Sequence, residues 1–238
     1  MFTGIVEEIG RVTSIEQRGE NRRITIAAAN TPRELKPGDS VAVSGVCLTA
    51  LDIKPRSSVA RPSEVGSFCA DLAPETWVRT SFSRIHEGAL VNLELPMKSD
   101  GRFGGHIVQG HVDGCGQLLA LDPVIPANDP AFDPHTTDWT LKVRVPASVR
   151  HWIVPKGSVA IEGISLTIAA VDADTISIAI LPLTYWRSNL HALAPGAPVN
   201  VEADVLVKLA WQQMQAQSKS EAKSGFELTE PWLVANGY

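Results

Sequence analysis

Short runs of aliphatic and β-branched residues, separated by Gly or Pro, recur along most of the chain. In the first half such runs begin at Ile5 and recur at residues 23–26, 40–43 and 90–95. Val, Ile and Thr favour extended strands, and Gly and Pro favour the turns between them. A domain of about 100 residues made of such strands favours a small antiparallel barrel, because closure removes the exposed edges of the sheet.

The pattern becomes helical after Asp204. The next residues are strong helix formers without Gly or Pro, with apolar side chains at Val205 and Leu209 and further candidates at Trp211 and Met214. This spacing predicts one C-terminal helix. Because a lone helix with so polar a remainder would be marginal in water, we expect its apolar stripe to pack on the barrels or on partner subunits.

The chain contains an internal repeat. Ser40–Thr49 (SVAVSGVCLT) aligns with Ser158–Thr167 (SVAIEGISLT) at an offset of 118, with six identities in ten positions. A period of this length belongs to a domain rather than to a solenoid unit, so we predict two tandem homologous domains. Three further pairs of segments follow in preserved order: residues 4–10 with 110–116, 74–79 with 182–187, and 88–94 with 196–202.

The offsets of these pairs are 106, 118 and 108, so each half must contain an insertion. Residues 54–66, rich in Ser, Arg and Pro, and residues 121–138, rich in Pro and Asp, are the two candidates, and both are typical of loops. The expected division is an N-terminal barrel at residues 1–105, a C-terminal barrel at 106–203, a helix at 204–222 and a tail at 223–238.

Composition narrows the classes of function. The 238 residues are 44% hydrophobic and 20% charged, the balance of a soluble globular protein, and a net charge of −5 leaves no basic footprint for nucleic acid or an anionic membrane. Three cysteines without a CxxC pair indicate neither a disulfide framework nor a zinc cage. The N-terminus lacks the features of a signal peptide and no stretch approaches a membrane span, so we expect a cytoplasmic protein.

Four motifs in this order on a two-copy chain resemble the riboflavin synthase family, of the α-chain type. They are MFTGIV at the N-terminus, GVCLT at 45–49, GGHIVQGH at 104–111 and GISLT at 163–167, and the resemblance spans residues 1 to about 207. It implies that two molecules of 6,7-dimethyl-8-ribityllumazine are dismutated to riboflavin and 5-amino-6-(D-ribitylamino)uracil. It also implies a homotrimer without metal or redox cofactor, whose site lies between the N-barrel of one subunit and the C-barrel of its neighbour.

Repeat and resemblance together predict an all-β fold of two tandem homologous six-stranded antiparallel Greek-key β-barrels plus a C-terminal α-helix. The duplication suits a reaction between two identical heterocycles, because each barrel would hold one lumazine. Orienting two reactants in this way is worth up to about 7 to 11 kcal/mol when their alignment is good. Trimer contacts would come from the C-terminal helix and the barrels, and a shell of lumazine synthase around the protein is left open.

The two copies differ at one chemically important position. In a strand, Cys47 and Thr49 share one face while Leu48 points to the other, and Ser165, Leu166 and Thr167 repeat this arrangement in the second copy. The resemblance places Cys47 near the reacting methyl or C7 region, Ser165 where it helps water or hydroxyl add at C7, and Thr167 nearby. The alternatives are a buried structural cysteine and ordinary solvent-facing Ser and Thr.

His111 stands where the first copy has Ile5, which invites a functional interpretation. An imidazole that titrates near neutrality can shuttle the C7-methyl proton. His106, five residues earlier, falls on the opposite face of a strand, so a metal site shared by the two histidines is disfavoured. The alternative for both is a structural histidine, and we favour that alternative more for His106 than for His111.

Lys156 and Asp204 match a ligand-contacting lysine and an acidic residue near the active site of the family. Lys156 also suits an exposed turn. Asp204 also suits the N-cap of the helix that follows it, and it can fill this role and the active-site role at the same time. The catalytic residues expected are Cys47, His111, Ser165, Thr167 and Asp204.

The resemblance assigns the remaining substrate contacts to backbone amides and side chains of both halves. In the C-half, Leu183 stands where the family often carries a polar residue such as His, which puts a ribityl or structural contact in doubt. The expected N-half lining is Gly4, Ile5, Val6, Asp71, Leu72, Ala73, Pro74, Glu75 and Thr76; the C-half lining is Ala179, Ile180, Leu181, Pro182, Leu183 and Thr184; further contacts are Cys47, Leu48, Thr49, His111, Val112, Asp113, Lys156, Ser165, Leu166 and Thr167.

Two other classes of function compete with the synthase. A noncatalytic lumazine- or flavin-binding antenna protein on the same scaffold would lose the polar groups of the second half, and their retention favours the enzyme. A flavin-binding barrel of a reductase would add a nucleotide-binding domain, but Gly101-Arg-Phe-Gly-Gly105 lacks the GxGxxG context.

Overall fold

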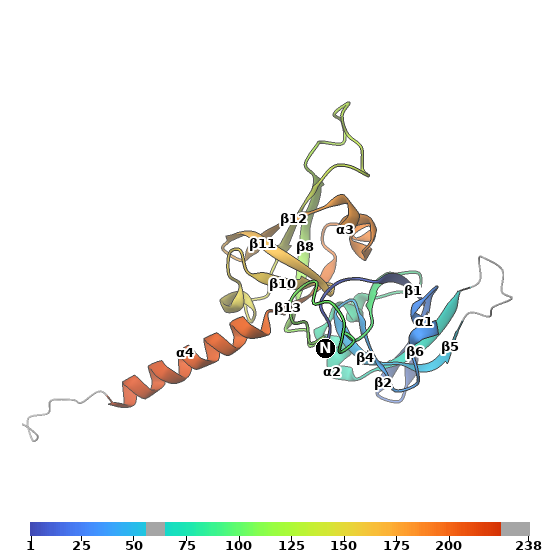
Figure 1. The fold of residues 1–238 in the computed structure, drawn as a ribbon, viewed down its shortest axis with the longest axis horizontal. Helices are drawn as coiled ribbons and strands as arrows, with labels where there is room; N and C mark the ends of the chain where they lie inside the picture. The colour runs from blue at the N-terminus through green and yellow to red at the C-terminus, as the bar shows by residue number, and fades with distance from the viewer. Residues whose placement is uncertain (56–64, 225–238) are drawn as a thin grey trace, which may run out of the picture. The chain divides into compact units, whose positions relative to one another are not determined.

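The C-terminal half is a closed, six-stranded antiparallel barrel. The structure is a computed structural model that describes residues 1–55 and 65–224, with side chains described as far as Gln217. The barrel order β10-β11-β12-β9-β8-β13 places chain neighbours apart at two points, which is the Greek-key connection that the sequence predicts (Figure 1). The strands are β8 (Gly114–Pro123), β9 (Trp139–Arg144), β10 (Ser158–Ile161), β11 (Ile164–Asp172), β12 (Thr175–Ile180) and β13 (Pro198–Ala203).

The N-terminal half repeats this barrel with one strand broken in two. Its order is β4-β3-β7-β1-β2-β6-β5, and β4 and β5 together correspond to β11, with the break at buried Ala50. Since β4 pairs with β3 and β5 pairs with β6, the two pieces close the sheet as β11 does. The strands are β1 (Glu8–Arg18), β2 (Asn21–Ala28), β3 (Ser40–Val43), β4 (Val46–Thr49), β5 (Leu51–Lys54), β6 (Gly66–Leu72) and β7 (Leu90–Glu94).

Each barrel encloses its own apolar core. Along β6 every second residue is buried, and Phe68 and Leu72 have no exposed surface. On β12 the buried positions are Ile176, Ile178 and Ile180, with the intervening residues turned outward. This two-residue period is the direct consequence of strand geometry, and it confirms the all-β prediction.

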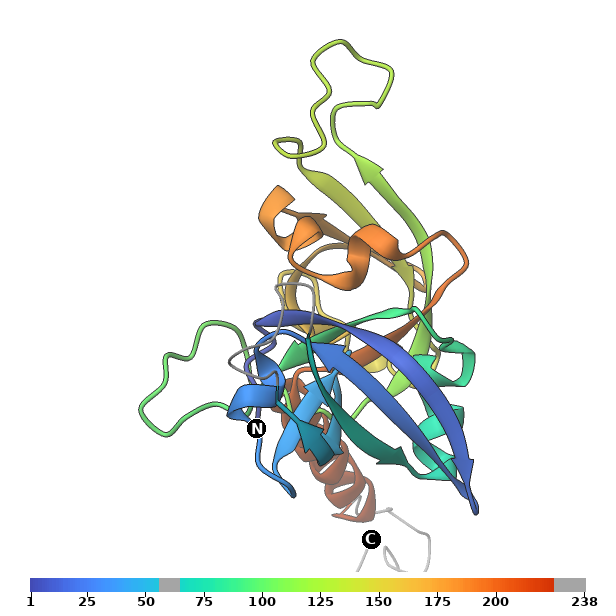
Figure 2. The same ribbon diagram turned by 90° about the vertical axis from the view of Figure 1, so that its right-hand side faces the viewer.

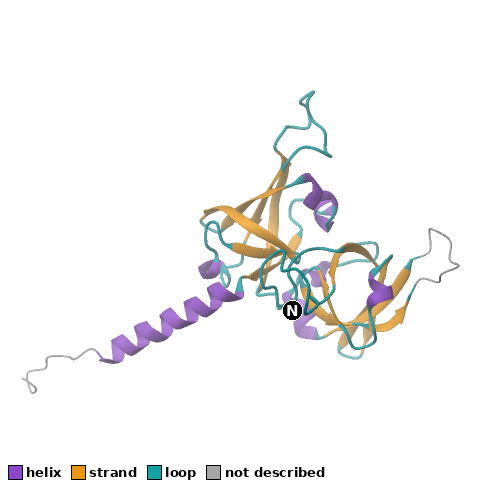
Figure 3. Ribbon diagram, viewed as in Figure 1, coloured by secondary structure: helices purple, strands orange, loops and turns teal. Residues whose placement is uncertain are grey.

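Helices are short except at the C-terminus (Figure 3). Equivalent helices α2 (Pro74–Arg79) and α3 (Pro182–Trp186) each begin with proline, whose fixed φ suits the first helical position. The short 3₁₀ turns that follow them are capped by the hydroxyls of Thr80 and Ser188. The remaining elements are α1 (Thr31–Glu34), η1 (Ser81–Arg84), η2 (Arg150–Trp152), η3 (Asn189–Ala192) and α4 (Val205–Ser224).

The predicted insertions lie in hairpins that are not equivalent, between β5 and β6 in the first half and between β8 and β9 in the second. Strand β8 continues to Pro123, so the loop of the second half begins at residue 124 and not at 121. In the first half most of the predicted loop, residues 56–64, lies outside the described residues. The predicted tail from 223 likewise lies outside them from residue 225, and α4 runs to Ser224. Within the described part of the chain, no helix is both long and apolar enough to cross a membrane.

Equivalent residues of the two barrels contact one another in matching pairs, as a pseudo-twofold axis requires. Phe2 and Val108 form an antiparallel bridge, with N–O distances of 2.8 and 3.1 Å, and pack with Ala42 and Ala160 in a small core between the barrels. Figure 2 shows the two barrels stacked on each other. The repeat in the sequence is therefore also a symmetry of the folded chain.

The turns at Gly45 and Gly163 meet at this axis. Both have positive φ, +80° and +78°, and a Cβ on either would come within 2.7 Å of the other's backbone nitrogen. Only glycine satisfies the conformation and the close approach together. This explains why Gly is retained at the centre of the repeated ten-residue motif.

Candidate active site

The segment that enters each barrel crosses to the other one. The Ser165 amide of the C-barrel donates to the Gly4 carbonyl at 2.7 Å, and the Cys47 amide of the N-barrel donates to the Gly110 carbonyl at 2.8 Å. Val6 packs on the core of the C-barrel and Val112 on the core of the N-barrel. Each half-site is therefore assembled from both copies of the repeat.

Two equivalent buried glutamates hold the crossing segments. Glu94 accepts hydrogen bonds from the Thr3 amide (2.6 Å), the Thr3 hydroxyl (2.8 Å) and the Gly4 amide (2.9 Å). Glu202 accepts from the Gln109 amide (2.7 Å) and the Gly110 amide (3.0 Å). Burial raises the pKa of Glu94, and the hydrogen bonds from Thr3 and Gly4 oppose that shift.

A pocket of about 250 Å³ opens at the crossing point in the C-half. The sequence interpretation assigned Gly4, Ile5 and Val6 to the N-half and was wrong on this point, because the N-terminal segment lies against Ser165. The repeat alone gives equivalent positions but not which barrel a crossing segment reaches. The pocket is lined by Gly4, Ile5, Val6, Ile164, Ser165, Leu183, Thr184, Arg187 and Ser188.

The repeat defines an equivalent N-half set. Cys47 replaces Ser165, His111 replaces Ile5, and Glu75 replaces Leu183, so the N-half set is the more polar one. His111 is exposed and directly follows Gly110, whose carbonyl accepts from Cys47. The equivalent residues are Gly110, His111, Val112, Val46, Cys47, Glu75, Thr76, Arg79 and Thr80.

The predicted alternation on the two motif strands is observed. Cys47 is half-buried and Thr49 exposed, while Leu48 between them is 6% exposed and belongs to the core. Ser165 and Thr167 have the same placement on β11. The polar face of each motif strand is thus available to a ligand.

His106 contacts the side chain of Ser165, although the sequence favoured a structural role more for His106 than for His111. The Nδ1 of His106 lies 2.7 Å from the Ser165 hydroxyl oxygen, and its Nε2 is buried without a hydrogen-bond partner among the described residues. Burial lowers the pKa of His106, and the charge of Asp204 opposes this shift. At neutral pH the imidazole is therefore uncharged and able to take a proton. The GGHIVQGH motif contained this histidine but gave no sign of its partner.

Asp204 and Lys156 lie at the ends of C-barrel strands. Asp204 directly follows β13, is half-buried, and acts electrostatically on His106. Lys156 is exposed in a turn with a φ of +66°, where its amide donates to the Ile168 carbonyl at 2.8 Å. The structure therefore brings Asp204 to the Ser165 side of the site and places Lys156 at the turn before β10.

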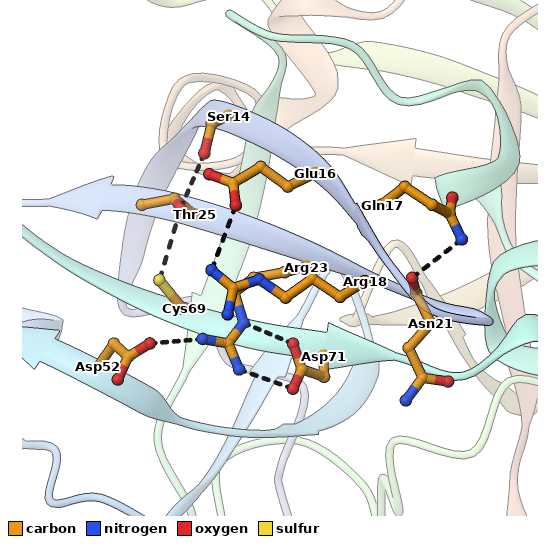
Figure 4. Close-up of polar contacts among 10 residues, drawn as sticks. All are labelled: Ser14, Glu16, Gln17, Arg18, Asn21, Arg23, Thr25, Asp52, Cys69 and Asp71. Atoms are coloured by element: carbon orange, nitrogen blue, oxygen red, sulfur yellow. Dashed lines mark hydrogen bonds and ion pairs between the residues drawn. The ribbon is translucent and has the colours of Figure 1, made fainter.

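Asp71, an expected N-half contact, is engaged in an ion pair (Figure 4). Its two carboxylate oxygens accept from the Arg23 guanidinium at 2.7 and 2.8 Å, and Arg23 also contacts Asp52 at 2.5 Å. The hydrogen bonds from Arg23 lower the pKa of Asp71. The Asp71 carboxylate thus pairs β6 with β2.

Several expected contact residues have buried side chains. Leu48, Leu72, Leu166 and Ile180 are between 0% and 8% exposed and belong to the barrel cores. They can face a ligand only through the backbone. Ala73, Pro74, Ala179, Leu181 and Leu183 are exposed or half-exposed, and Asp113 accepts from the Ala203 amide at 2.8 Å.

Arg187 lines the C-half pocket but was not predicted. A signal for it existed, because Arg79 and Arg187 occupy the same place in the repeated Pro-x-Thr-x-x-Arg motif. A guanidinium at this position can donate to carbonyl or hydroxyl oxygens of a ligand. Glu75 forms an ion pair with Arg79 in the N-half, whereas the equivalent Leu183 leaves Arg187 without that partner.

Comparison with known proteins gives a consistent family. The Lumazine binding domain family matches twice, at residues 3–96 and 109–204. Riboflavin synthase of Mycobacterium tuberculosis is 37% identical over 220 residues, covering 91% of this chain and 99% of the relative. Riboflavin synthase of Actinobacillus pleuropneumoniae is 35% identical over 228 residues, covering 96% of each chain.

A solved structure has the same fold. LumP in complex with riboflavin is similar with a TM-score of 0.69 and 22% sequence identity, over 85% of this chain and 99% of that one. At this identity the likeness speaks for the fold alone. The two domain matches and the near full-length sequence relatives together show that the chain belongs to the riboflavin synthase family and that it carries the lumazine-binding domain in two tandem copies.

Proposed function

We propose that the protein dismutates two molecules of 6,7-dimethyl-8-ribityllumazine into riboflavin and 5-amino-6-(D-ribitylamino)uracil. A four-carbon unit passes from one lumazine to the other, so no external oxidant or reductant is consumed. The observation that carries the proposal is the pair of equivalent half-sites, in which Cys47 and Ser165 occupy matching strand positions beside matching crossing segments. LumP has been solved with this lumazine bound, and it shares the fold.

The C-half supplies a base for the first step. Ser165 and His106 are 2.7 Å apart. When a water held by the Ser165 hydroxyl adds at C7 of the bound lumazine, the neutral imidazole accepts the proton released through that hydroxyl, and the electron pair of the C7 double bond moves into the ring. The carboxylate of Asp204 stabilises the positive charge that develops on His106. Thr167 on the same strand face offers a further hydroxyl.

The N-half supplies different groups at the same positions. Cys47 presents a thiol where the C-half has a hydroxyl, and His111 is exposed on the adjoining segment. His111 would carry the proton removed from the C7 methyl group of the other lumazine, whose anion is delocalised over the ring. Different side chains at matching positions suit a reaction in which one lumazine donates the four-carbon unit and the other accepts it.

The pocket of about 250 Å³ suits one heterocycle, so the reaction needs a second half-site. We propose that N- and C-halves of neighbouring subunits face one another in a homotrimer, with α4 among the contacts. Backbone amides of both halves would pair with the uracil-like edge, and hydroxyls with the ribityl chain. We place the enzyme in the cytoplasm, where free thiols such as those of Cys47, Cys69 and Cys115 persist; a shell of lumazine synthase stays an open expectation.

The test is turnover with the lumazine as the sole substrate. The proposal predicts one riboflavin for every two lumazines consumed, with the ribitylaminouracil as coproduct in equal amount. Tight binding of lumazine without formation of riboflavin would contradict the proposal and support the antenna class instead.

A further inference from the structure

The long loop at residues 124–138 belongs to the C-half alone. In the N-half the equivalent hairpin joins β1 to β2 through the tight turn Gly19–Glu20. In the C-half the loop extends away from the barrel between β8 and β9, above α3 (Figure 2). The insertion between β8 and β9 therefore has no counterpart at the equivalent position of the N-half.

The loop is fastened to α3 by one residue. The Trp186 indole Nε1 donates to the Pro134 carbonyl at 2.8 Å, and the indole ring stacks on His135 with centroids 5.0 Å apart and planes 26° apart. A hydrogen bond and a ring stack on consecutive loop residues fix both the position and the orientation of this side chain.

Further ring contacts connect α3 to the barrel. Tyr185 stacks on Trp139 with centroids 3.9 Å apart and planes 7° apart, and Trp139 is 8% exposed at the start of β9. The Trp186 ring meets the Tyr185 ring edge-on with centroids 5.0 Å apart, and it lies tilted by 32° against the His191 ring with centroids 5.5 Å apart. The loop, α3 and the barrel wall thus form one aromatic cluster, His135, Trp139, Tyr185, Trp186 and His191.

Helix α3 also carries the wall of the C-half pocket. Leu183 and Thr184 line the pocket beside Ser165, and Leu183 at the same time borders a second, apolar hollow formed with His135 and Trp186. A five-residue helix has no stability of its own, so its contacts decide where Leu183 lies. In the N-half, the equivalent helix is held by Arg22, which lies over the ring of Trp77 at 3.9 Å.

We propose that the 124–138 loop is a positioning element for the C-half: through Trp186 it fixes α3, and through α3 it fixes the Leu183 wall against which one lumazine binds. This inference rests on the proposed function and names the half in which the loop acts. Preordering the wall lowers the cost of ordering it on binding, so the loop tightens the C-half and leaves the N-half unchanged.

The experiment measures the two half-sites separately. Lumazine with ¹³C-labelled methyl groups is titrated into the full-length His106→Ala chain, whose slow turnover preserves the ligand, and each further variant is made in this background. NMR then follows the titration, and each half-site gives its own bound methyl signals. Leu183→Ala, which changes the C-half wall, identifies the C-half signals. The main variant replaces residues 125–137 by Asn-Gly, a turn suited to the hairpin that Val124 and Asp138 already close with a 2.8 Å hydrogen bond.

We expect the loop replacement to weaken C-half binding about tenfold, the scale of losing one preordered wall, with N-half binding unchanged. Trp186→Leu should reproduce the loss with the loop intact, and Trp186→Phe should restore part of it by retaining the stack. Asp129→Ala breaks only a hydrogen bond within the loop and should bind as wild type. At saturating lumazine, riboflavin turnover should fall less than the affinity does.

Equal weakening of both halves, or wild-type binding by the loop and Trp186→Leu variants, would overturn the inference while the proposed function stands. No bound lumazine signals in the His106→Ala chain with its loop intact, together with no riboflavin formed by the wild-type chain, would overturn both. If the loop replacement does not fold, the two Trp186 variants decide the test by their C-half binding. Melting curves of Trp186→Leu and Trp186→Phe show whether these two variants are folded.

Discussion

At the residue scale, the chemistry depends on how burial and neighbours tune a few side chains. His106 shows this best, because the sequence placed it in a motif but could not show that it folds against Ser165, a residue far along the chain. Its lowered pKa comes from burial, a tertiary property. In contrast, the outward placement of Cys47, Thr49, Ser165 and Thr167 follows from strand periodicity and was predictable.

The Ser165–His106 pair should act as a unit in turnover. His106→Ala and Ser165→Ala should each lower riboflavin formation by about 10²-fold, the usual contribution of positioned proton transfer. The double variant should be little slower than either single one, because each removes the same hydrogen-bonded pair. Exposed His86→Ala is the matched control and should keep wild-type turnover. Fully multiplicative losses would show that the two residues act independently.

The acid limb of the pH–rate profile should lie below 6.5, the ordinary pKa of histidine. Burial lowers the pKa of His106, so the imidazole is still mostly neutral and able to accept a proton at pH 6.5. The unfolded chain binds more protons than the folded one just below pH 6.5, so this site's contribution to the free energy of unfolding also decreases as pH falls. A profile of kcat against pH checks this, and an acid limb above 6.5 would contradict it.

At the element scale, the crossing segments decide the composition of each half-site. Sequence reasoning recovered the strands and their equivalence, because the repeated motifs and the two-residue period are local. It assigned Gly4–Val6 to the wrong half, since nothing local shows that a segment leaves its own barrel. The buried carboxylates of Glu94 and Glu202 that hold these segments were also missed, because their partners are backbone amides distant in sequence.

Adding a methyl group at Gly110 should loosen the N-half. Gly110 has a φ of +81°, and a Cβ there would lie 2.6 Å from the Cys47 Cβ. Gly110→Ala should lower the free energy of unfolding by roughly 1–3 kcal/mol more than Gly19→Ala, which shares a positive φ but has open space around it. Urea unfolding measures the difference, and lumazine affinity should fall only for Gly110→Ala. Equal losses of stability would mean that the close approach to Cys47 relaxes without cost.

At the scale of the whole molecule, a polar network joins the two barrels at the pseudo-twofold axis. The side-chain amide of Asn92 donates to the Glu162 backbone carbonyl at 2.9 Å, and the side-chain amide of the equivalent Asn200 donates to the Ser44 backbone carbonyl at 2.8 Å. The side-chain oxygen of Asn92 also accepts from the backbone amide of Asn189 at 2.6 Å. The repeat predicted two domains, but the sequence could not show how their buried polar groups pair.

Removing one asparagine from this network should be costly. Asn92→Ala leaves buried groups of Glu162 and Asn189 without the hydrogen bonds that Asn92 supplies. Each buried group that loses its partner costs about 1–3 kcal/mol, and local relaxation recovers part of that cost. The free energy of unfolding should therefore fall by about 2–4 kcal/mol. Asn21→Ala, at an exposed hairpin turn, is the matched control and should change stability little. Thermal or urea unfolding measures both, and a loss below that of the control would show that the network does not hold the barrels together.

The central claim is that each chain carries two half-sites for the same heterocycle. The most direct measurement counts the lumazines bound per chain at equilibrium in the His106→Ala variant, whose slowed turnover preserves the ligand and whose pocket-lining residues are all intact. Two 6,7-dimethyl-8-ribityllumazine molecules per chain is the result expected. Saturation at one per chain would contradict the account.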